Sequence, residues 1–112
     1  MNKIIFWFTT HKMRNYWFDY AIRFLRKRGA DIEYNNLESY INLFNFNLKI
    51  CFKVYVNESS IVGYGDVNQY WVDELFENNF EEFFITFIKE NIEEVTDEKT
   101  RNENTRLNKV RT

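Results

Sequence analysis

The sequence predicts an α+β domain with the element order β-α-β-β-β-β-α-α. Three observations support this prediction. An apolar and aromatic run lies near the N-terminus, helical periodicity marks residues 12–28 and 67–95, and a period of two runs through residues 43–56. Because the middle strands follow one another with only turns between them, we expect an antiparallel-dominated sheet with the helices packed on one face.

The first two elements are the most clearly marked. Residues 4–9 are apolar without alternation, which favours a strand buried on both faces. Residues 12–28 form an amphipathic helix that Thr9 or Thr10 can cap, and Gly29 stands where a helix commonly ends. The apolar face of this helix consists of Met13, Trp17, Tyr20, Ala21, Phe24 and Leu25.

The middle of the chain predicts four further segments of strand. Residues 30–34 and 38–44 are short candidates. Residues 43–56 could be one long strand or two strands joined near residues 45–47, and two are favoured because strands average about 5–6 residues. The first of these two is then the end of the 38–44 segment. Residues 61–64 follow a turn and would form the return strand. In the alternating segment, Leu48, Ile50, Phe52, Val54 and Val56 share the core face, whereas Lys49, Cys51, Lys53 and Tyr55 share the solvated face.

Two helices are expected to close the domain. Asp66 and Gln69 fit a broad capping box for a helix over residues 67–77, and Asn79 would cap a second helix that carries a phenylalanine stripe. One bent helix is the alternative. Residues 1–95 would then be a single domain, and the charged residues 96–112 a disordered tail.

The composition limits the class of protein. Twenty percent of the residues are aromatic, 45% are hydrophobic and 29% are charged, as in a globular chain. The longest apolar run, Ile4–Phe8, is far shorter than the roughly 20 residues of a membrane span, so we expect a cytoplasmic protein without membrane contact. An excess of Asn, Lys, Ile, Phe and Tyr over Gly, Ala, Pro and Arg indicates an AT-rich genome.

Charge is distributed unevenly along the chain. Residues 1–30 hold seven Lys or Arg against one Asp, although the whole chain has a net charge of −2. Such a basic region can contact phosphates or an acidic partner, and it can also be ordinary solvated surface. The candidate contacts are Lys12, Arg14, Arg23, Arg26, Lys27 and Arg28 on the helix, with Lys49, Lys53 and Tyr55 on the sheet face.

Residues 67–95 have the opposite character, with eight acidic residues against Lys89. An acidic helix face of this kind can dock on a basic groove, as a DNA-mimicking inhibitor does, or can be ordinary solvated surface. The candidate contacts for a basic partner are Asp73, Glu74, Glu77, Glu81, Glu82, Glu90, Glu93 and Glu94.

Catalytic equipment is sparse. His11 is the single histidine and Cys51 the single cysteine, so a Cys/His zinc site and an internal disulfide are excluded. A nucleophilic Cys51 would need His11 as its base. The residues around His11 contain no glycine for a phosphate loop. We therefore expect no cofactor, no metal site and no enzymatic activity.

These features favour a small non-enzymatic binding protein that occupies a partner macromolecule through a charged, aromatic-rich surface. A virus or a mobile element could encode an inhibitor or regulator of this kind. The many aromatic side chains also fit a homodimer. The alternative function is a nucleic-acid-binding module that uses the basic first helix together with the solvated sheet face. A small enzyme that depends on His11 or Cys51 is the third hypothesis.

Overall fold

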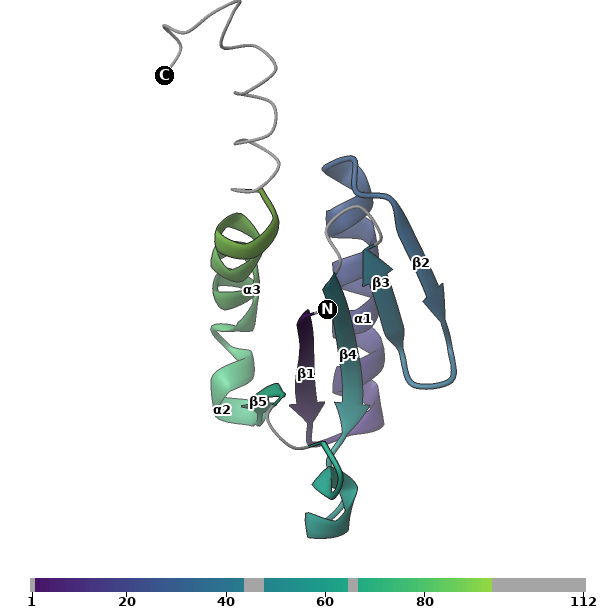
Figure 1. Cartoon of the computed structure of the whole chain (residues 1–112). Coiled ribbons are helices and arrows are strands. Elements are labelled where there is room, and N and C mark those ends of the chain that lie inside the picture. The colour runs from purple at the N-terminus through teal and green to yellow at the C-terminus, as the bar shows by residue number, and fades with distance from the viewer. Residues whose placement is uncertain (1, 44–47, 65–66, 94–112) are drawn as a thin grey trace, which may run out of the picture. The chain divides into compact units, whose positions relative to one another are not determined.

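The computed structural model describes residues 2–43, 48–64 and 67–93, with the backbone alone for Asn2, Ile92 and Glu93. The chain divides into two compact units, residues 1–77 and residues 78–112. The first unit contains the sheet and two helices, and the second contains the remaining helical segment (Figure 1). The charged residues 96–112, for which disorder is predicted, lie outside the described residues.

The first unit is built on a five-stranded mixed sheet with the strand order β2-β3-β4-β1-β5. Its strands are β1 (Asn2–Phe8), β2 (Ile32–Asn35), β3 (Tyr40–Leu43), β4 (Leu48–Val54) and β5 (Asn68–Val72). β1 pairs in parallel with both β4 and β5, whereas β2 with β3 and β3 with β4 are antiparallel. The α+β class is therefore confirmed, and the expectation of an antiparallel-dominated sheet is wrong. Long connections before the β2–β3–β4 meander and before β5 return the chain to the end of the sheet where β1 begins, which parallel pairing requires.

The central strand β1 is buried on both faces, as its unbroken apolar run predicts. Every residue from Ile4 to Phe8 is at most 3% exposed. Phe6 and Phe8 contact Phe52 of β4 on one face, with ring centroids 5.5 and 5.7 Å apart. Ile5 and Trp7 pack with Cys51 on the other face.

The helix α1 (His11–Lys27) covers the Phe6 face of the sheet (Figure 1). Thr10 is its N-cap, and its hydroxyl accepts a hydrogen bond of 3.1 Å from the Met13 amide. Phe18 of α1 lies 5.7 Å from Phe52, ring centroid to ring centroid. Gly29 follows with a φ of +83°, the left-handed conformation that glycine tolerates best after a helix. The predicted helix over 12–28 is thus confirmed to within one residue.

The opposite face of the sheet is covered by the chain that follows β4. Tyr55, Ile61, Tyr64 and Val67 pack against Ile5, Trp7 and Cys51. The short 3₁₀ helix η2 (Glu58–Ile61) begins at Asn57, whose side chain accepts a hydrogen bond from the Ser59 amide. The predicted return strand over 61–64 is therefore wrong, because this segment turns back over the face instead of pairing. The sheet face that carries Cys51 is therefore partly covered, whereas the alternation of residues 43–56 predicts a solvated face.

Residues 68–72 form the edge strand β5 where a helix over 67–77 was expected. Trp71 lies alongside Trp7 of β1 with ring centroids 6.5 Å apart. Only the last turn of the expected helix forms, as α2 (Glu74–Glu77). Its N-terminus is capped by Asp73, which accepts a 2.8 Å hydrogen bond from the Phe76 amide. Asp66, the expected cap, lies outside the described residues.

The second unit contains α3 (Phe80–Ile88), which continues into the π-helical turn η3 (Lys89–Glu93). The predicted phenylalanine stripe is present, since Phe84 contacts both Phe80 and Phe87 along the helix. Asn79 precedes the helix but makes no side-chain capping hydrogen bond, so the expected cap is wrong. A turn at residues 78–79 separates α2 from α3, which are therefore two helices.

The β5 assignment can be tested with a neighbouring pair of substitutions. The Trp7 indole Nε1 donates a 2.7 Å hydrogen bond to Gln69 Oε1, and Trp7 is 2% exposed. We expect Gln69→Ala to lower the free energy of unfolding by about 1–3 kcal/mol, because a buried donor loses its partner. The exposed neighbour Asn68 points to the other face, and Asn68→Ala should change stability by less than about 0.5 kcal/mol. Equal losses of unfolding free energy in the two variants, measured by urea denaturation, would contradict the assignment of residues 68–72 to a strand.

Candidate functional site

The predicted basic residues of α1 fall on more than one side of the helix. Lys12 and Arg23 lie roughly three helical turns apart and share one exposed side with Arg26 and Lys27. The buried residues Met13, Trp17, Ala21, Ile22 and Leu25 hold the other side of α1 in the core of the first unit. We call Lys12, Arg23, Arg26 and Lys27 the α1 basic face.

Some of these cations already have partners within the chain. Arg23 forms an exposed ion pair of 3.0 Å with Asp19, one turn earlier. The guanidinium of Arg26 lies 5.6 Å from the centre of the Tyr34 ring on β2. Exposed contacts of this kind contribute little to stability and leave the outer sides of the cations accessible. The α1 basic face therefore keeps a net positive charge, because Asp19 offsets only one of its four cations.

Two predicted contacts lie away from this face. Arg14 is half-buried, and its Nε donates a 2.8 Å hydrogen bond to Asn15. Arg28 follows the last residue of α1 as its C-cap, with its guanidinium 4.9 Å from the centre of the Phe24 ring. Both side chains serve local structure in this arrangement.

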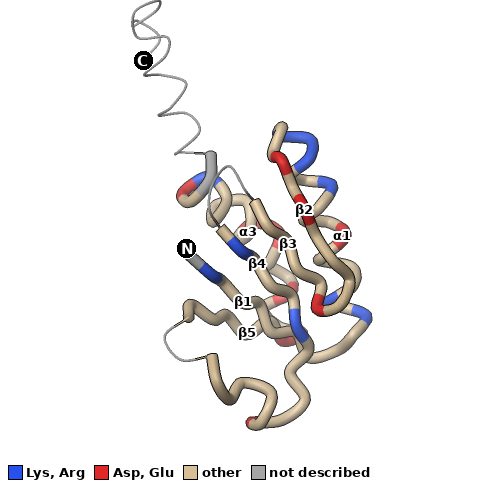
Figure 2. The backbone as a smooth tube through the Cα atoms, turned by 45° about the vertical axis from the view of Figure 1, so that its right-hand side comes forward, with Lys and Arg blue, Asp and Glu red and all other residues tan. Residues whose placement is uncertain are grey.

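The predicted sheet contacts Lys49, Lys53 and Tyr55 lie on the opposite face from α1. Lys49 and Lys53 alternate with Phe52, which packs toward the helix. Figure 2 shows basic positions on β1 and β4 as well as on α1. The sheet therefore separates the two groups, and the structure does not join them into one nucleic-acid interface. Tyr55 is half-buried with its ring edge-on to Trp7, so it does not form an open platform.

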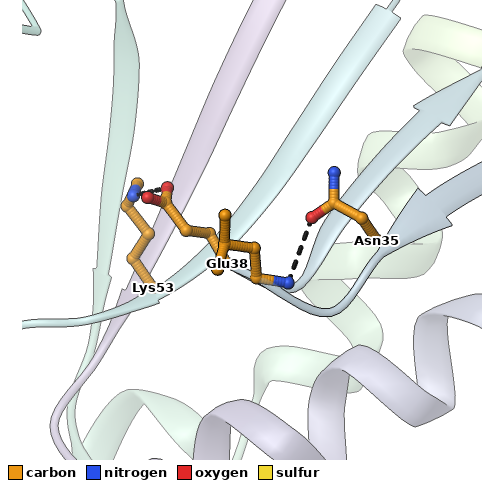
Figure 3. Close-up of polar contacts among 4 residues, drawn as sticks. Asn35, Glu38 and Lys53 are labelled. Carbon is orange, nitrogen blue, oxygen red and sulfur yellow. Dashed lines mark hydrogen bonds and ion pairs between the residues drawn. The ribbon is translucent and has the colours of Figure 1, made fainter.

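Lys53 is largely enclosed, with 12% of its side chain exposed. Its ammonium group pairs with Glu38, which precedes β3 (Figure 3). Burial alone would lower the pKa of Lys53, but hydrogen bonds to Glu38 and Tyr64 outweigh burial and raise it. The Asn35 side chain accepts a hydrogen bond of 3.1 Å from the Leu37 amide and shapes the turn that carries Glu38. This pair ties the β2–β3 turn to β4.

Sequence reasoning missed three residues of the same face, namely Lys3, Tyr40 and Tyr64. The Lys3 ammonium lies 5.3 Å from the centre of the Tyr64 ring, and the Lys49 ammonium lies 5.6 Å from that of Tyr40. The alternation of side chains along β1 places Lys3 on the same face as Ile5 and Trp7, and this alternation was the only signal for Lys3 in the sequence. Its proximity to Lys49 depends on the pairing of β1 with β4, which no local pattern shows.

The predicted acidic contacts are divided between the two units. In the first unit, Glu74 is exposed, Asp73 caps α2 and Glu77 accepts a 2.8 Å hydrogen bond from the Trp17 indole. In the second unit, three of the acidic residues have exposed side chains, namely Glu81, Glu82 and Glu90. The side chain of Glu93 and the whole of Glu94 lie outside the described residues.

Cys51 and His11 do not form a catalytic pair in this arrangement. Cys51 is fully buried, and burial raises the pKa of its thiol despite the nearby lysines Lys3 and Lys53. His11 is the exposed first residue of α1 and is not among the residues packed around Cys51. A buried thiol with a raised pKa is a poor nucleophile.

The described part of the chain contains neither a metal-binding cluster nor a membrane-spanning helix. No group of three or more His, Cys, Asp or Glu side chains there is placed to hold a metal ion. No described helix combines the length and apolar content that crossing a bilayer requires. The chain matches no protein-family model, and no curated protein or solved structure shows significant similarity to it.

The burial of Cys51 predicts a specific pH dependence of stability. Because the folded-state pKa of the thiol is raised, the unfolded chain loses this proton first as pH rises above about 8.5. The free energy of unfolding should then fall with pH, by at most about 1.4 kcal/mol per pH unit from this group. Lys53, whose pKa is also raised, should add to the fall only above about pH 10.

Urea denaturation across this pH range should show the fall in the unaltered protein. The Cys51→Ala variant should have a flatter profile between about pH 8.5 and 10, whatever its stability at neutral pH. Parallel profiles for the two proteins would contradict the raised thiol pKa.

Proposed function

We propose that this protein is a small non-enzymatic binding protein that occupies an acidic partner macromolecule through the α1 basic face. The observation that carries the proposal is the display of four cations on the exposed side of a helix whose other side is packed in the core. Because the backbone of α1 is already ordered, binding would order only side chains. A binder of this size acts by covering a surface, as a cytoplasmic inhibitor or regulator does.

Nucleic acid is the acidic partner that the dimensions of the face favour. Lys12 and Lys27 are separated by about 22 Å along the helix axis, from a rise of about 1.5 Å per residue. A nucleic-acid strand in a duplex carries a phosphate about every 3.4 Å along the axis, so this face can follow several phosphates. Tyr16, which is 56% exposed, lies on the same side of α1 and adds an aromatic ring. An acidic protein is the second candidate.

Fluorescence anisotropy tests this proposal with four probes: duplex DNA, single-stranded DNA, RNA and poly-glutamate, at about 50 and 200 mM salt. We expect Arg23→Glu with Lys27→Glu to weaken binding at least about tenfold and to reduce the salt dependence by about two released ions. Poly-glutamate binding without nucleic-acid binding would identify an acidic protein as the partner class.

A matched control comes from a second exposed lysine. Lys27→Glu and Lys89→Glu change the net charge equally, but Lys89 lies in η3, outside the α1 basic face. We expect Lys27→Glu alone to weaken binding, with circular dichroism unchanged in both variants. Equal weakening by both variants, or no probe bound at the lower salt concentration, would overturn the proposal.

A further inference from the structure

Two lysines lie side by side on the sheet face opposite α1. Lys3 of β1 and Lys49 of β4 are register partners, and neighbouring strands are about 4.8 Å apart. Like charges placed next to each other on one sheet face destabilise the sheet. Within the described residues, neither lysine forms an ion pair with a carboxylate. In the part of the chain that the structure describes, the fold thus brings two positive charges together without a carboxylate partner for either.

Glu38, a carboxylate on the same face, already has a partner. Glu38 pairs with Lys53, which lies two strand positions beyond Cys51 on the same face of β4 (Figure 3). That ion pair is neutral as a unit, so the local charge of the patch comes from Lys3 and Lys49. Since uncompensated charge of this kind is stabilised by an opposite charge, an anion is the ligand that fits the pair.

Tyrosine rings border both ammonium groups. Lys3 Nζ lies 5.3 Å from the centre of the Tyr64 ring, and Lys49 Nζ lies 5.6 Å from the centre of the Tyr40 ring. These cation–π contacts restrict the two flexible side chains and keep them on the sheet. The two tyrosine hydroxyls are already used within the protein, since that of Tyr40 is hydrogen-bonded to Cys51 and that of Tyr64 to Lys53. The groups that the patch offers to a ligand are therefore the two ammonium groups.

An exposed aromatic ring lies on the same face. Trp71 of β5 is 47% exposed and lies alongside Trp7, which has the same parity on β1 as Lys3. Base–aromatic stacking is tolerant of sequence and is commonly combined with lysine contacts to phosphate. Because Lys3 and Trp7 are four positions apart on β1, Trp71 lies about 13 Å along the sheet from the lysine pair. A ligand that contacts both features must therefore be a chain of nucleotides, whereas a single nucleotide would contact the lysine pair alone.

We propose that Lys3 and Lys49, bordered by Tyr40 and Tyr64, form a binding site for the phosphate group of a nucleotide. The phosphate can belong to a free nucleotide or to a single-stranded nucleic acid. This site does not depend on the α1 basic face, because the sheet lies between them. It also gives the two paired lysines a role that the sequence alternation alone does not assign.

The test uses the full-length protein and three probes: inorganic phosphate, AMP and a ten-residue oligothymidylate. Binding is followed by ¹H–¹⁵N NMR at constant ionic strength, with chloride as the balancing anion. We expect saturable shifts of amides in β1 and β4 with AMP. Lys3→Gln and Lys49→Gln should each weaken AMP binding at least about tenfold, the loss of one charge-assisted contact.

Lys89→Gln, a matched control at the exposed lysine of η3, should bind AMP as the unaltered protein does. Trp71→Ala should weaken the binding of the oligothymidylate but not of AMP or inorganic phosphate, because a single nucleotide on the lysine pair does not reach Trp71. Tighter binding of the oligothymidylate than of AMP, lost in both sheet variants, would identify a nucleic-acid chain as the source of the phosphate. Equal affinities would identify a free nucleotide.

Two results would overturn the phosphate site. One is the absence of saturable binding of all three probes to a folded protein. The other is equal weakening by Lys89→Gln and Lys49→Gln, which would show only general attraction to positive charge. Because the sheet variants leave α1 unchanged, failure of this site and failure of the α1 basic face are distinguished.

Discussion

The first unit depends on the burial of β1 on both of its faces. Its residues from Ile4 to Phe8 are almost completely removed from solvent, and each large apolar side chain buried in this way contributes roughly 1.5–3 kcal/mol. A strand of this kind needs a neighbour on each edge and a cover on each face. β4 and β5 supply the neighbours, and the covers are α1 on one face and residues 55–64 with Val67 on the other.

This central strand also determines where the charges lie. The sheet that β1 anchors places α1 on one face and the lysines of β1 and β4 on the other. The cations of α1 and the lysines of the sheet therefore form two separate surfaces, one long and exposed and one compact and bordered by tyrosines. Binding at either surface would proceed without competition from the other.

Hydrophobic periodicity in the sequence predicted those elements whose conformation is set by neighbouring residues. The apolar stripe of α1, the period of two in β4 and the continuous run of β1 each identify one element correctly. Residues 68–72 were misinterpreted, because a capping-box pattern and apolar spacing resembled a helix start. Their strand conformation depends on pairing with β1, more than 60 residues earlier, and on the Trp7–Gln69 hydrogen bond. Such non-local pairing leaves no local periodicity.

The candidate sites likewise divide into residues that local patterns identify and residues that only non-local pairing brings together. The exposed cations of α1 could be listed from helical spacing, although spacing did not show that Arg14 and Arg28 serve local contacts. Lys49 and Lys53 were identified from strand alternation, but their solvated setting was not correct, because the chain after β4 folds over that face. The partnership of Lys3 with Lys49 required the parallel register, which only the three-dimensional structure supplies.

Native-state hydrogen exchange would test the central claim most directly. Amides of core strands exchange only through global unfolding, whereas amides of edge strands exchange through smaller openings. If β1 is the element on which the first unit depends, its amides and their partners in β4 will exchange last, with a free energy equal to that of global unfolding. Exchange of β1 as fast as that of the edge strand β2, well below the global value, would contradict this account.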